Sequence, residues 1–175
     1  MLGTIVAIIV VLLLIVVGFA ATRPNTFRVA RSASIAAAPD KIYPLIDDFH
    51  RWTAWSPYEG LDPNLKRSYG GAASGVGATY AWEGNNKAGA GSMEITAAQA
   101  PSKVTIRLEF TKPFAARNTA EFTLVPEGAG TTVTWAVVGP RPLMMKVMGL
   151  FVSMDNMLGK DFEKGLASLR TAAEA

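Results

Sequence analysis

The sequence contains no cysteine and a single histidine among its 175 residues. The missing cysteine excludes a disulfide-stapled scaffold, a Cys-based zinc module and a thiol enzyme. With His50 as the only imidazole, a site built on paired histidines is excluded as well. No loop carries the several spaced acids that a carboxylate metal site needs. We therefore expect neither a metal nor a cofactor.

Common catalytic motifs are also missing. The chain has no Gly-x-Ser-x-Gly, no phosphate-binding Gly-Lys-Ser/Thr loop and no Gly-x-Gly-x-x-Gly. His50 follows Asp47 and Asp48, so it is either a general base or a surface histidine paired with a carboxylate. Because no nucleophile or second base stands nearby in the sequence, we assign no catalytic residue, and whether the protein is an enzyme stays open.

Charge is absent from the first 22 residues, and all 31 Lys, Arg, Asp and Glu side chains follow them. The apolar run Leu2–Ala21 is long enough, at about 1.5 Å per residue, to cross the roughly 30 Å hydrocarbon core of a bilayer. We predict a transmembrane anchor over residues 1–22 and one domain over residues 23–175. The alternatives are a cleaved signal peptide, with Gly18-Phe19-Ala20 as the cleavage site, and a buried core helix. Cleavage is disfavoured because no basic residue precedes the run and because the run is long.

Arg23, Arg28 and Arg31 precede the first acid, Asp40. The positive-inside rule therefore predicts a single-pass protein of the cell membrane with its domain in the cytoplasm, and the exported side is the alternative. The net charge is +3, but no basic stripe with interleaved aromatics is present. We expect no nucleic-acid partner, and the oligomeric state stays open.

Alternating apolar and polar residues predict strands over much of the domain. In Lys103–Lys112 the apolar side chains fall on one face and the polar ones on the other, which is typical of an antiparallel sheet with one wetted face. Two short helices are expected near Asp40–Asp47 and Asp47–Trp52. The other predicted strands are Thr26–Ala36, Lys66–Tyr69, Ala78–Glu83, Gly91–Ala98, Asn118–Pro126 and Thr131–Val138.

From Pro142 onward apolar residues recur at steps of three and four, which predicts one helix of about 30 residues. Gly149 and Gly159 weaken the case for an unbroken helix. The order of elements predicts an α+β fold, in which a curved antiparallel sheet wraps around the C-terminal helix. Such a packing often leaves a cavity between the helix and the concave face of the sheet.

This order of elements resembles the START-like, helix-grip superfamily, also called SRPBCC, and within it the polyketide cyclase/dehydrase and lipid-transport group. The resemblance covers about residues 26–172, and an N-terminal anchor is common in bacterial members. It implies a domain that binds a hydrophobic molecule, although the superfamily also holds cyclases and members without assigned activity. It rests on Phe27–Ser32 before Ile35, on Ala38-Pro39, on Asp48–Trp52 with Trp55–Pro57 and Asp62-Pro63, on Trp82–Asn85 and on the terminal helix.

Aromatic and methionine side chains are the candidate lining of a ligand cavity, although core filling explains each of them equally simply. Two polar residues, Arg31 and Asn118, share a face with apolar strand neighbours. Each would bind a polar ligand end or lie at a strand end that meets water, and a buried Arg31 needs an anion. The predicted ligand-binding residues are Trp52, Trp55, Tyr80, Trp82, Phe110, Asn118, Phe122, Trp135, Met148, Phe151 and Met154.

The sequence thus predicts a membrane-anchored START-like domain that binds a hydrophobic small molecule or lipid in a cavity between the sheet and the C-terminal helix. Residues 2–21 would provide the membrane contact. The alternatives are an enzyme resembling polyketide cyclases and dehydrases, which can act largely by positioning its substrate, and a non-catalytic stress or partner-binding module.

Overall fold

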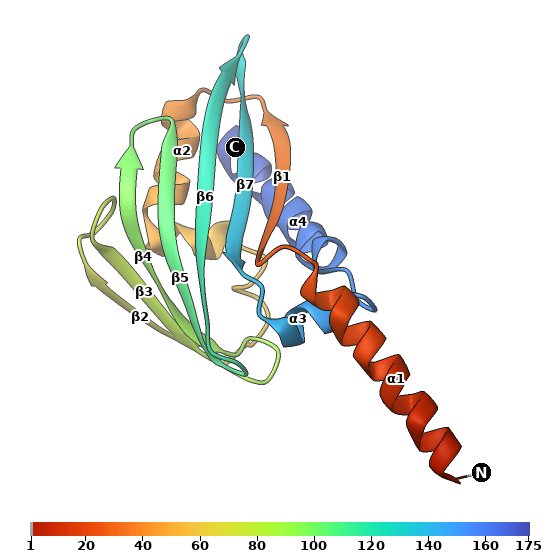
Figure 1. Ribbon diagram of the computed structural model, residues 1–175. Helices are drawn as coiled ribbons and strands as arrows, with labels where there is room; N and C mark the ends of the chain where they lie inside the picture. The colour runs from red at the N-terminus through yellow and green to blue at the C-terminus, as the bar shows by residue number, and fades with distance from the viewer. Residues whose placement is uncertain (1) are drawn as a thin grey trace.

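The computed structural model describes residues 2–175 as one N-terminal helix followed by an α+β domain (Figure 1). The N-terminal helix is α1 (Leu2–Ala21). Seven strands and four further helical segments follow: β1 (Thr26–Ile35), α2 (Pro39–Asp47), the 3-10 helix η1 (Phe49–Ala54), β2 (Lys66–Gly71), β3 (Ala78–Glu83), β4 (Ala90–Gln99), β5 (Lys103–Lys112), β6 (Ala116–Glu127), β7 (Gly130–Pro140), α3 (Leu143–Met148) and α4 (Met154–Glu174).

The strands form one antiparallel sheet in the order β1–β7–β6–β5–β4–β3–β2. The sheet is curved, and α2, η1 and α4 lie on its concave side (Figure 1). In β5 the alternating residues Val104 and Ile106 are fully buried, whereas Thr105 and Arg107 lie on the other face. The predicted α+β fold with a curved antiparallel sheet is therefore confirmed, and its cause is the period-two pattern of the strands.

Aromatic side chains fill the part of the concave face that η1 covers. Trp52 and Trp55 of η1 meet Phe122 edge-on, with ring centroids 5.9 Å apart in both pairs. Phe122 in turn stacks on Trp135 at 5.1 Å, and Trp135 stacks on Phe162 of α4 at 4.3 Å. Sheet, η1 and α4 thus share one dry core.

Two indole groups hold η1 against α2. Trp52 Nε1 donates to the backbone carbonyl of Ile46 at 2.9 Å, and Trp55 Nε1 donates to that of Leu45 at 2.7 Å. Both carbonyls lie at the C-terminal end of α2, where no intrahelical donor remains for them. The two tryptophans therefore bury their rings without leaving a polar group unpaired.

The prediction of a single C-terminal helix is wrong in one respect. The segment forms two helices, α3 and α4, which are joined by residues 149–153. Gly149 ends the first helix, and a Cβ at this position would collide with the guanidinium of Arg141. Ser153 then caps α4 by accepting a hydrogen bond from the backbone N–H of Asn156 at 3.2 Å. Gly159 does not break α4, although it shares with Gly149 the low helix propensity that made both positions suspect.

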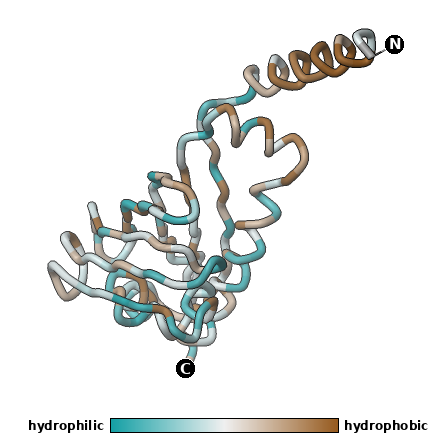
Figure 2. Tube along the Cα trace, turned by 90° about the horizontal axis from the view of Figure 1, so that it is seen from below, coloured by the Kyte–Doolittle hydropathy of each residue, from teal (hydrophilic) through white to brown (hydrophobic). Residues whose placement is uncertain are grey.

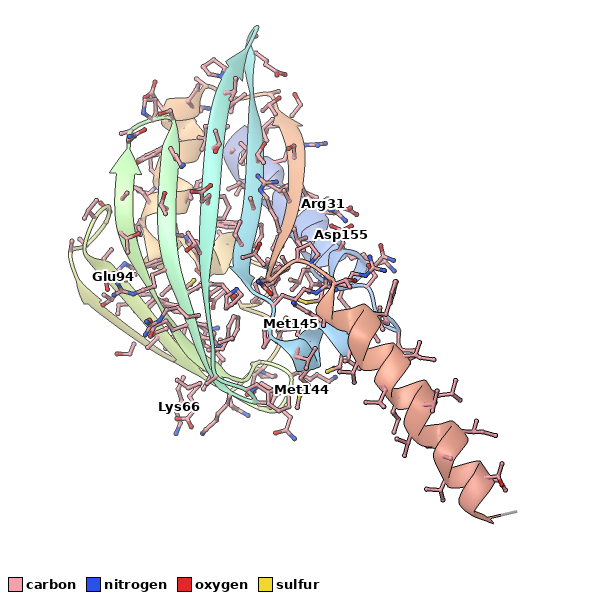
Figure 3. The ribbon with its side chains drawn as sticks, in the orientation of Figure 1. Arg31, Lys66, Glu94, Met144, Met145 and Asp155 are labelled. Atoms are coloured by element: carbon pink, nitrogen blue, oxygen red, sulfur yellow. The ribbon has the colours of Figure 1, made fainter. Side chains whose placement is uncertain are left out.

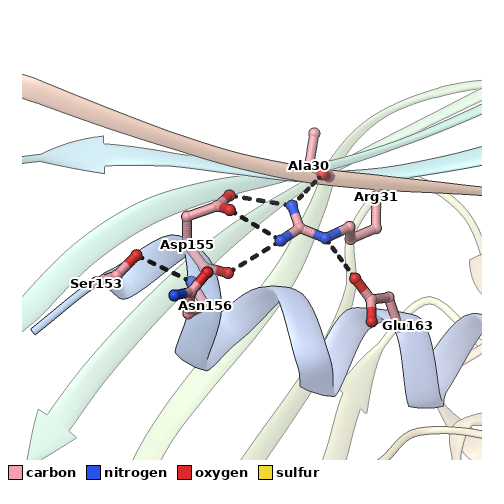
Figure 4. Close-up of polar contacts among 6 residues, drawn as sticks. All are labelled: Ala30, Arg31, Ser153, Asp155, Asn156 and Glu163. Atoms are coloured by element: carbon pink, nitrogen blue, oxygen red, sulfur yellow. Dashed lines mark hydrogen bonds and ion pairs between the residues drawn. The ribbon is translucent and has the colours of Figure 1, made fainter.

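Arg31 explains why a glycine is needed at position 159. Its side chain crosses from β1 to α4, and a Cβ at Gly159 would collide with the guanidinium. All five N–H donors of Arg31 are used: they reach the carboxylates of Asp155 and Glu163 and the backbone carbonyls of Ala30 and Asp155, at 2.8 to 3.1 Å (Figure 4). The anion expected for Arg31 is therefore supplied by α4 rather than by a ligand.

Helix α1 extends away from the domain (Figure 1). Residues Gly3–Ala21 are long and apolar enough to cross a bilayer, a property shared by signal sequences. Most of the helix is exposed, but Ala20 is 0% exposed because the end of α1 packs against the domain. The chain passes from α1 to β1 through four residues, 22–25.

Candidate functional site

Antiparallel pairing arranges the concave-face residues in rows that cross the strands, and burial changes from row to row. In the row through Trp135, Phe122 and Val104 these three side chains are buried. Two rows nearer to the start of β1, and hence to α1, are only partly covered, and we call them the site rows. The first contains Phe27, Gly139, Asn118, Leu108, Met93, Tyr80 and Tyr69, and the second contains Ala116, Phe110, Gly91, Trp82 and Arg67.

Aromatic rings form the apolar wall of the site rows. Trp82 lies parallel to Tyr80 with centroids 6.0 Å apart, and Phe110 meets Trp82 edge-on at 5.6 Å. The Trp82 ring lies over Gly91, where a Cβ would come within 2.6 Å of it. Trp82 Nε1 donates to the backbone carbonyl of Ala88 at 3.0 Å. The glycine and this hydrogen bond together fix the ring flat on the sheet.

Asn118 places an amide in the middle of the first site row. It is half-buried between Gly139 of β7 and Leu108 of β5. Gly139 makes room for it, because a Cβ there would collide with Asn118 Oδ1 and with the Phe27 ring. A half-buried amide among apolar neighbours can donate and accept one hydrogen bond to a bound molecule.

A charged cluster closes the site rows at the β2–β3 edge of the sheet. Tyr80 donates its hydroxyl hydrogen to Glu59 Oε1 at 2.7 Å, and Arg67 Nε donates to Glu59 Oε2 at 2.6 Å. Burial and the Glu59 carboxylate raise the pKa of Tyr80, which keeps the phenol protonated. Both oxygens of the Glu59 carboxylate thus already have a donor.

Sequence reasoning missed Glu59 and Arg67. Arg67 could have been found, because it shares a strand face with Tyr69 and pairs with Trp82 across the sheet. Glu59 lies in an irregular segment between η1 and β2, where no periodicity indicates the direction of a side chain.

The structure divides the predicted ligand-binding residues into three groups. Four of them, Tyr80, Trp82, Phe110 and Asn118, lie together in the site rows. A second group, Trp52, Trp55, Phe122 and Trp135, forms the packed core described above. The third group consists of Met148, Phe151 and Met154 on the C-terminal segment, where Met148 and Phe151 are exposed and Met154 is half-buried. Ligand contact by any of these residues stays a prediction.

The surface of residues 2–175 has hollows, of which two lie near the site rows or the C-terminal helices. One of about 460 Å³ lies over the ends of β2 to β5, and its lining includes Arg67, Trp82 and the ion pair between Lys112 and Glu83, whose atoms are 2.8 Å apart. The other, of about 540 Å³, is formed by residues 151–161 at the start of α4. The first adjoins the second site row, and the second adjoins the loop between α3 and α4.

His50 lies at the surface, with Nδ1 2.9 Å from Asp48 Oδ1 and its ring stacked on Tyr69 at 4.1 Å. This is the carboxylate-paired surface histidine that the sequence left as an alternative to a general base. Within residues 2–175 no group of three or more His, Asp or Glu side chains comes together in a way that could hold a metal ion.

Comparison with known proteins supports the fold. A family model described as polyketide cyclase / dehydrase and lipid transport matches residues 26–174. No curated protein sequence matches the chain. Among solved structures, protein CV1439 from Chromobacterium violaceum is similar with a TM-score of 0.60 at 14% identity, over 87% of this chain and 99% of that chain.

Two further structures have the same fold at the same TM-score of 0.60. Major latex-like protein 151 from Panax ginseng is 15% identical over 85% of this chain and 97% of that chain. The Aha1 protein from Colwellia psychrerythraea, solved as a dimer, is 16% identical over 85% of this chain and 96% of that chain. At these identities the likeness concerns the fold alone.

Proposed function

Because the chain belongs to the polyketide cyclase / dehydrase and lipid transport family, we propose that it binds a hydrophobic small molecule or lipid at the site rows, between the sheet and the C-terminal helices. In this proposal α1 is retained as a single-pass anchor, residues 2–21 cross the membrane, and the domain formed by residues 23–175 faces the cytoplasm.

The observation that carries this proposal is the change in burial along the concave face. The row through Phe122 is closed by aromatic side chains from η1 and α4. By contrast, Leu108, Phe110, Asn118 and Trp82 in the site rows are only half-buried, although most of this surface is apolar. Apolar surface left half-covered on the inside of a curved sheet is stabilised when a ligand displaces water from it.

The polar groups of the site support a ligand with one polar end. Asn118 offers an amide in the middle of the first row. Glu59 and Arg67 close the rows at the other edge, where Arg67 lies on β2, four strands from Asn118 along the sheet. A molecule with an apolar body and one hydrogen-bonding head fits between them, as many lipids and small aromatic metabolites would.

The alternative of a cyclase or dehydrase can act largely by positioning its substrate, and proton transfer in addition would need a free acid or base beside the ligand. Glu59 is the carboxylate at the edge of the site rows, but its two oxygens accept hydrogen bonds from Tyr80 and Arg67. A carboxylate held in this way is stabilised as an anion and positions its neighbours. The geometry therefore gives no support to acid or base catalysis by Glu59, and we propose binding as the function.

Native mass spectrometry of the full-length chain tests the proposal. The protein is released from detergent micelles, and we expect a fraction to carry a molecule that co-purified with it. In Asn118→Ala that fraction should fall, because one neutral hydrogen bond contributes about 1 kcal/mol, or roughly fivefold in affinity.

Thr119→Ala is the matched control. Thr119 is the next residue of β6, is exposed, and lies on the opposite face of the sheet. Its substitution should leave the bound fraction unchanged. Equal bound fractions in Asn118→Ala and in the wild type would remove Asn118 from the site. A chain that carries no molecule and takes up none from added membrane lipid extract would contradict the proposal as a whole.

A further inference from the structure

Exposed apolar side chains gather on α3, on the loop after it and on the first turn of α4. Phe151 is 78% exposed and Met144 is 74% exposed. Soluble monomers rarely leave a large contiguous group of such side chains in water. We call this surface the α3 patch, and it consists of Leu143, Met144, Met148, Phe151, Val152 and Met157.

The α3 patch lies next to the point where α1 leaves the domain. Helices α1 and α3 contact each other, and Met144 and Met145 lie beside the base of α1 (Figure 3). Figure 2 shows a hydrophobic stretch of the domain beside the end of the strongly hydrophobic helix. The patch is therefore continuous with the surface of the helix that crosses the membrane in the proposed function.

Hydrogen bonds make this junction stiff. Arg141 donates its backbone N–H to the carbonyl of Asn25 at 2.6 Å, and Lys146 Nζ donates to Asn25 Oδ1 at 2.7 Å. Asn25 is the last residue before β1, only four residues after α1 ends. A short connection that is bonded at its end cannot move α3 far from the base of α1. If α1 spans a bilayer, the α3 patch must then lie at the bilayer surface.

Two cations lie behind the patch, and one of them matches the chemistry of that surface. Lys146 is buried, and its hydrogen bond goes to a neutral amide oxygen rather than to a carboxylate. The buried Nε of Arg141 has no hydrogen-bond partner within residues 2–175. Lys146 therefore holds the junction together, whereas Arg141 is partly exposed. A cation placed just behind exposed apolar side chains is typical of segments that lie in the membrane interface, where its charged end reaches lipid phosphates.

We propose that the α3 patch inserts into the membrane interface beside α1, with Arg141 directed at the phosphates of anionic lipids. The inference rests on the proposed function only in that α1 is retained in the membrane. The occupant of the patch is the lipid bilayer itself. The domain is then held at the membrane by two contacts, and these fix its orientation.

The absence of cysteine makes a direct test possible, because a single introduced cysteine is the only thiol. Full-length Phe151→Cys is labelled with the fluorophore NBD and reconstituted in phosphatidylcholine nanodiscs that contain phosphatidylglycerol. We expect blue-shifted emission and severalfold stronger quenching by spin-labelled lipids than for Val125→Cys. Val125 is the matched control, because it is also exposed but lies on the β6–β7 hairpin, at the end of the domain opposite α1 (Figure 1).

The possible results separate the proposals from each other. Emission from the Phe151 label that matches the Val125 label would overturn the membrane contact. A blue shift without quenching by lipid spin labels would mean that a second copy of the chain covers the patch, which also overturns it. Quenching that is unchanged when phosphatidylcholine replaces all phosphatidylglycerol would overturn the assignment of anionic lipids.

A label at Leu13→Cys, near the middle of α1, tests the anchor independently. Quenching of this label by a spin label at the centre of the bilayer is expected. If it fails, the anchor of the proposed function fails, whereas a failure confined to the Phe151 label removes only the second contact. Because Phe151 is largely exposed, its substitution leaves the core intact, and a misfolded variant is recognised by loss of the near-ultraviolet spectrum of the buried tryptophans.

Discussion

Phe122 lies at the centre of the packed part of the concave face, and its truncation to alanine tests whether that part is a closed core. The side chain is 0% exposed and contacts Trp52, Trp55 and Trp135, with ring centroids 5.1 to 5.9 Å away. Removing a buried phenyl ring loses its transfer free energy and leaves a cavity, which together cost about 3–5 kcal/mol. The large rings around it cannot collapse into the space, so we expect the upper part of this range.

For a protein of this size each kcal/mol lowers the melting temperature by about 2–4 °C, so Phe122→Ala should lower it by roughly 6–20 °C. The assay is thermal unfolding of the full-length chain in detergent, followed by near-ultraviolet circular dichroism of the tryptophans. Phe114→Ala is the matched control, because Phe114 is 79% exposed and the same atoms are removed. It should change stability by less than about 0.5 kcal/mol.

A change in melting temperature of Phe122→Ala no larger than that of Phe114→Ala would refute the reasoning. It would mean that the Phe122 ring borders an open, solvated space rather than a dry core. The ligand would then extend under η1, and loss of bound molecule in the mass spectrum would accompany the substitution. A large loss of stability with ligand retained would instead limit binding to the site rows.

Three other predictions concern the attachment of α4 and the polar edge of the site. Gly159→Ala should displace the Arg31 guanidinium and speed backbone hydrogen exchange in the first half of α4, because a Cβ there collides with it; unchanged exchange would contradict this. The Arg31 hydrogen bonds lower the pKa of Asp155, so its contribution to stability is complete above about pH 4 and is lost as the pH falls through the lowered pKa. Asp155→Asn should remove that acid dependence when melting is followed from about pH 2 to about pH 6, whereas an identical acid dependence in the variant would assign it elsewhere. Tyr80→Phe leaves Glu59 with one donor fewer and should destabilise by about 0.5–1.5 kcal/mol in denaturant unfolding; a neutral effect would show that water replaces the hydroxyl.

Much of the fold follows from local pattern. The strands over Ala78–Glu83 and Lys103–Lys112 are predicted with their observed bounds. In Lys103–Lys112 the alternation has no interruption, and Ser102 and Pro113 mark its two ends. The other five strands differ from prediction by one or two residues at their ends, and in four of them alternation stops before the hydrogen-bonded ladder does. From β2 to β7 each strand pairs with the next strand in the sequence. In the described chain, the only pairing between strands distant in the sequence is that of β1 with β7.

Contacts between distant segments are what the sequence does not predict. Two glycines with the same helix propensity have opposite outcomes, because Gly149 lies against Arg141 at a helix end whereas Gly159 receives Arg31 from β1. In the same way, alternation places Arg31 on the inner face but gives no sign that Asp155 lies opposite it, 124 residues away in the sequence. The site is predicted in part for this reason: its strand residues follow a period, while Glu59 lies in a segment that has none.

Sheet register joins the proposed ligand site to the proposed anchor. Phe27 of the first site row is the second residue of β1, and Gly139 beside it is the last but one of β7. The chain enters β1 from α1 and leaves β7 toward α3, so both membrane-contacting segments of our proposals meet the sheet at the row that is half-buried. The row through Trp135, Phe122 and Val104 lies further along the same strands, beneath η1. A hydrophobic molecule would therefore pass between the bilayer and the site rows over a distance of a few residues, without crossing the solvent-exposed outer face of the sheet.

If α1 is replaced by an unrelated transmembrane helix with a long flexible linker, binding measured by native mass spectrometry should persist, whereas uptake of a lipid from the surrounding bilayer should slow. Equal uptake rates in the two proteins would show that the position of the site relative to the membrane has no role.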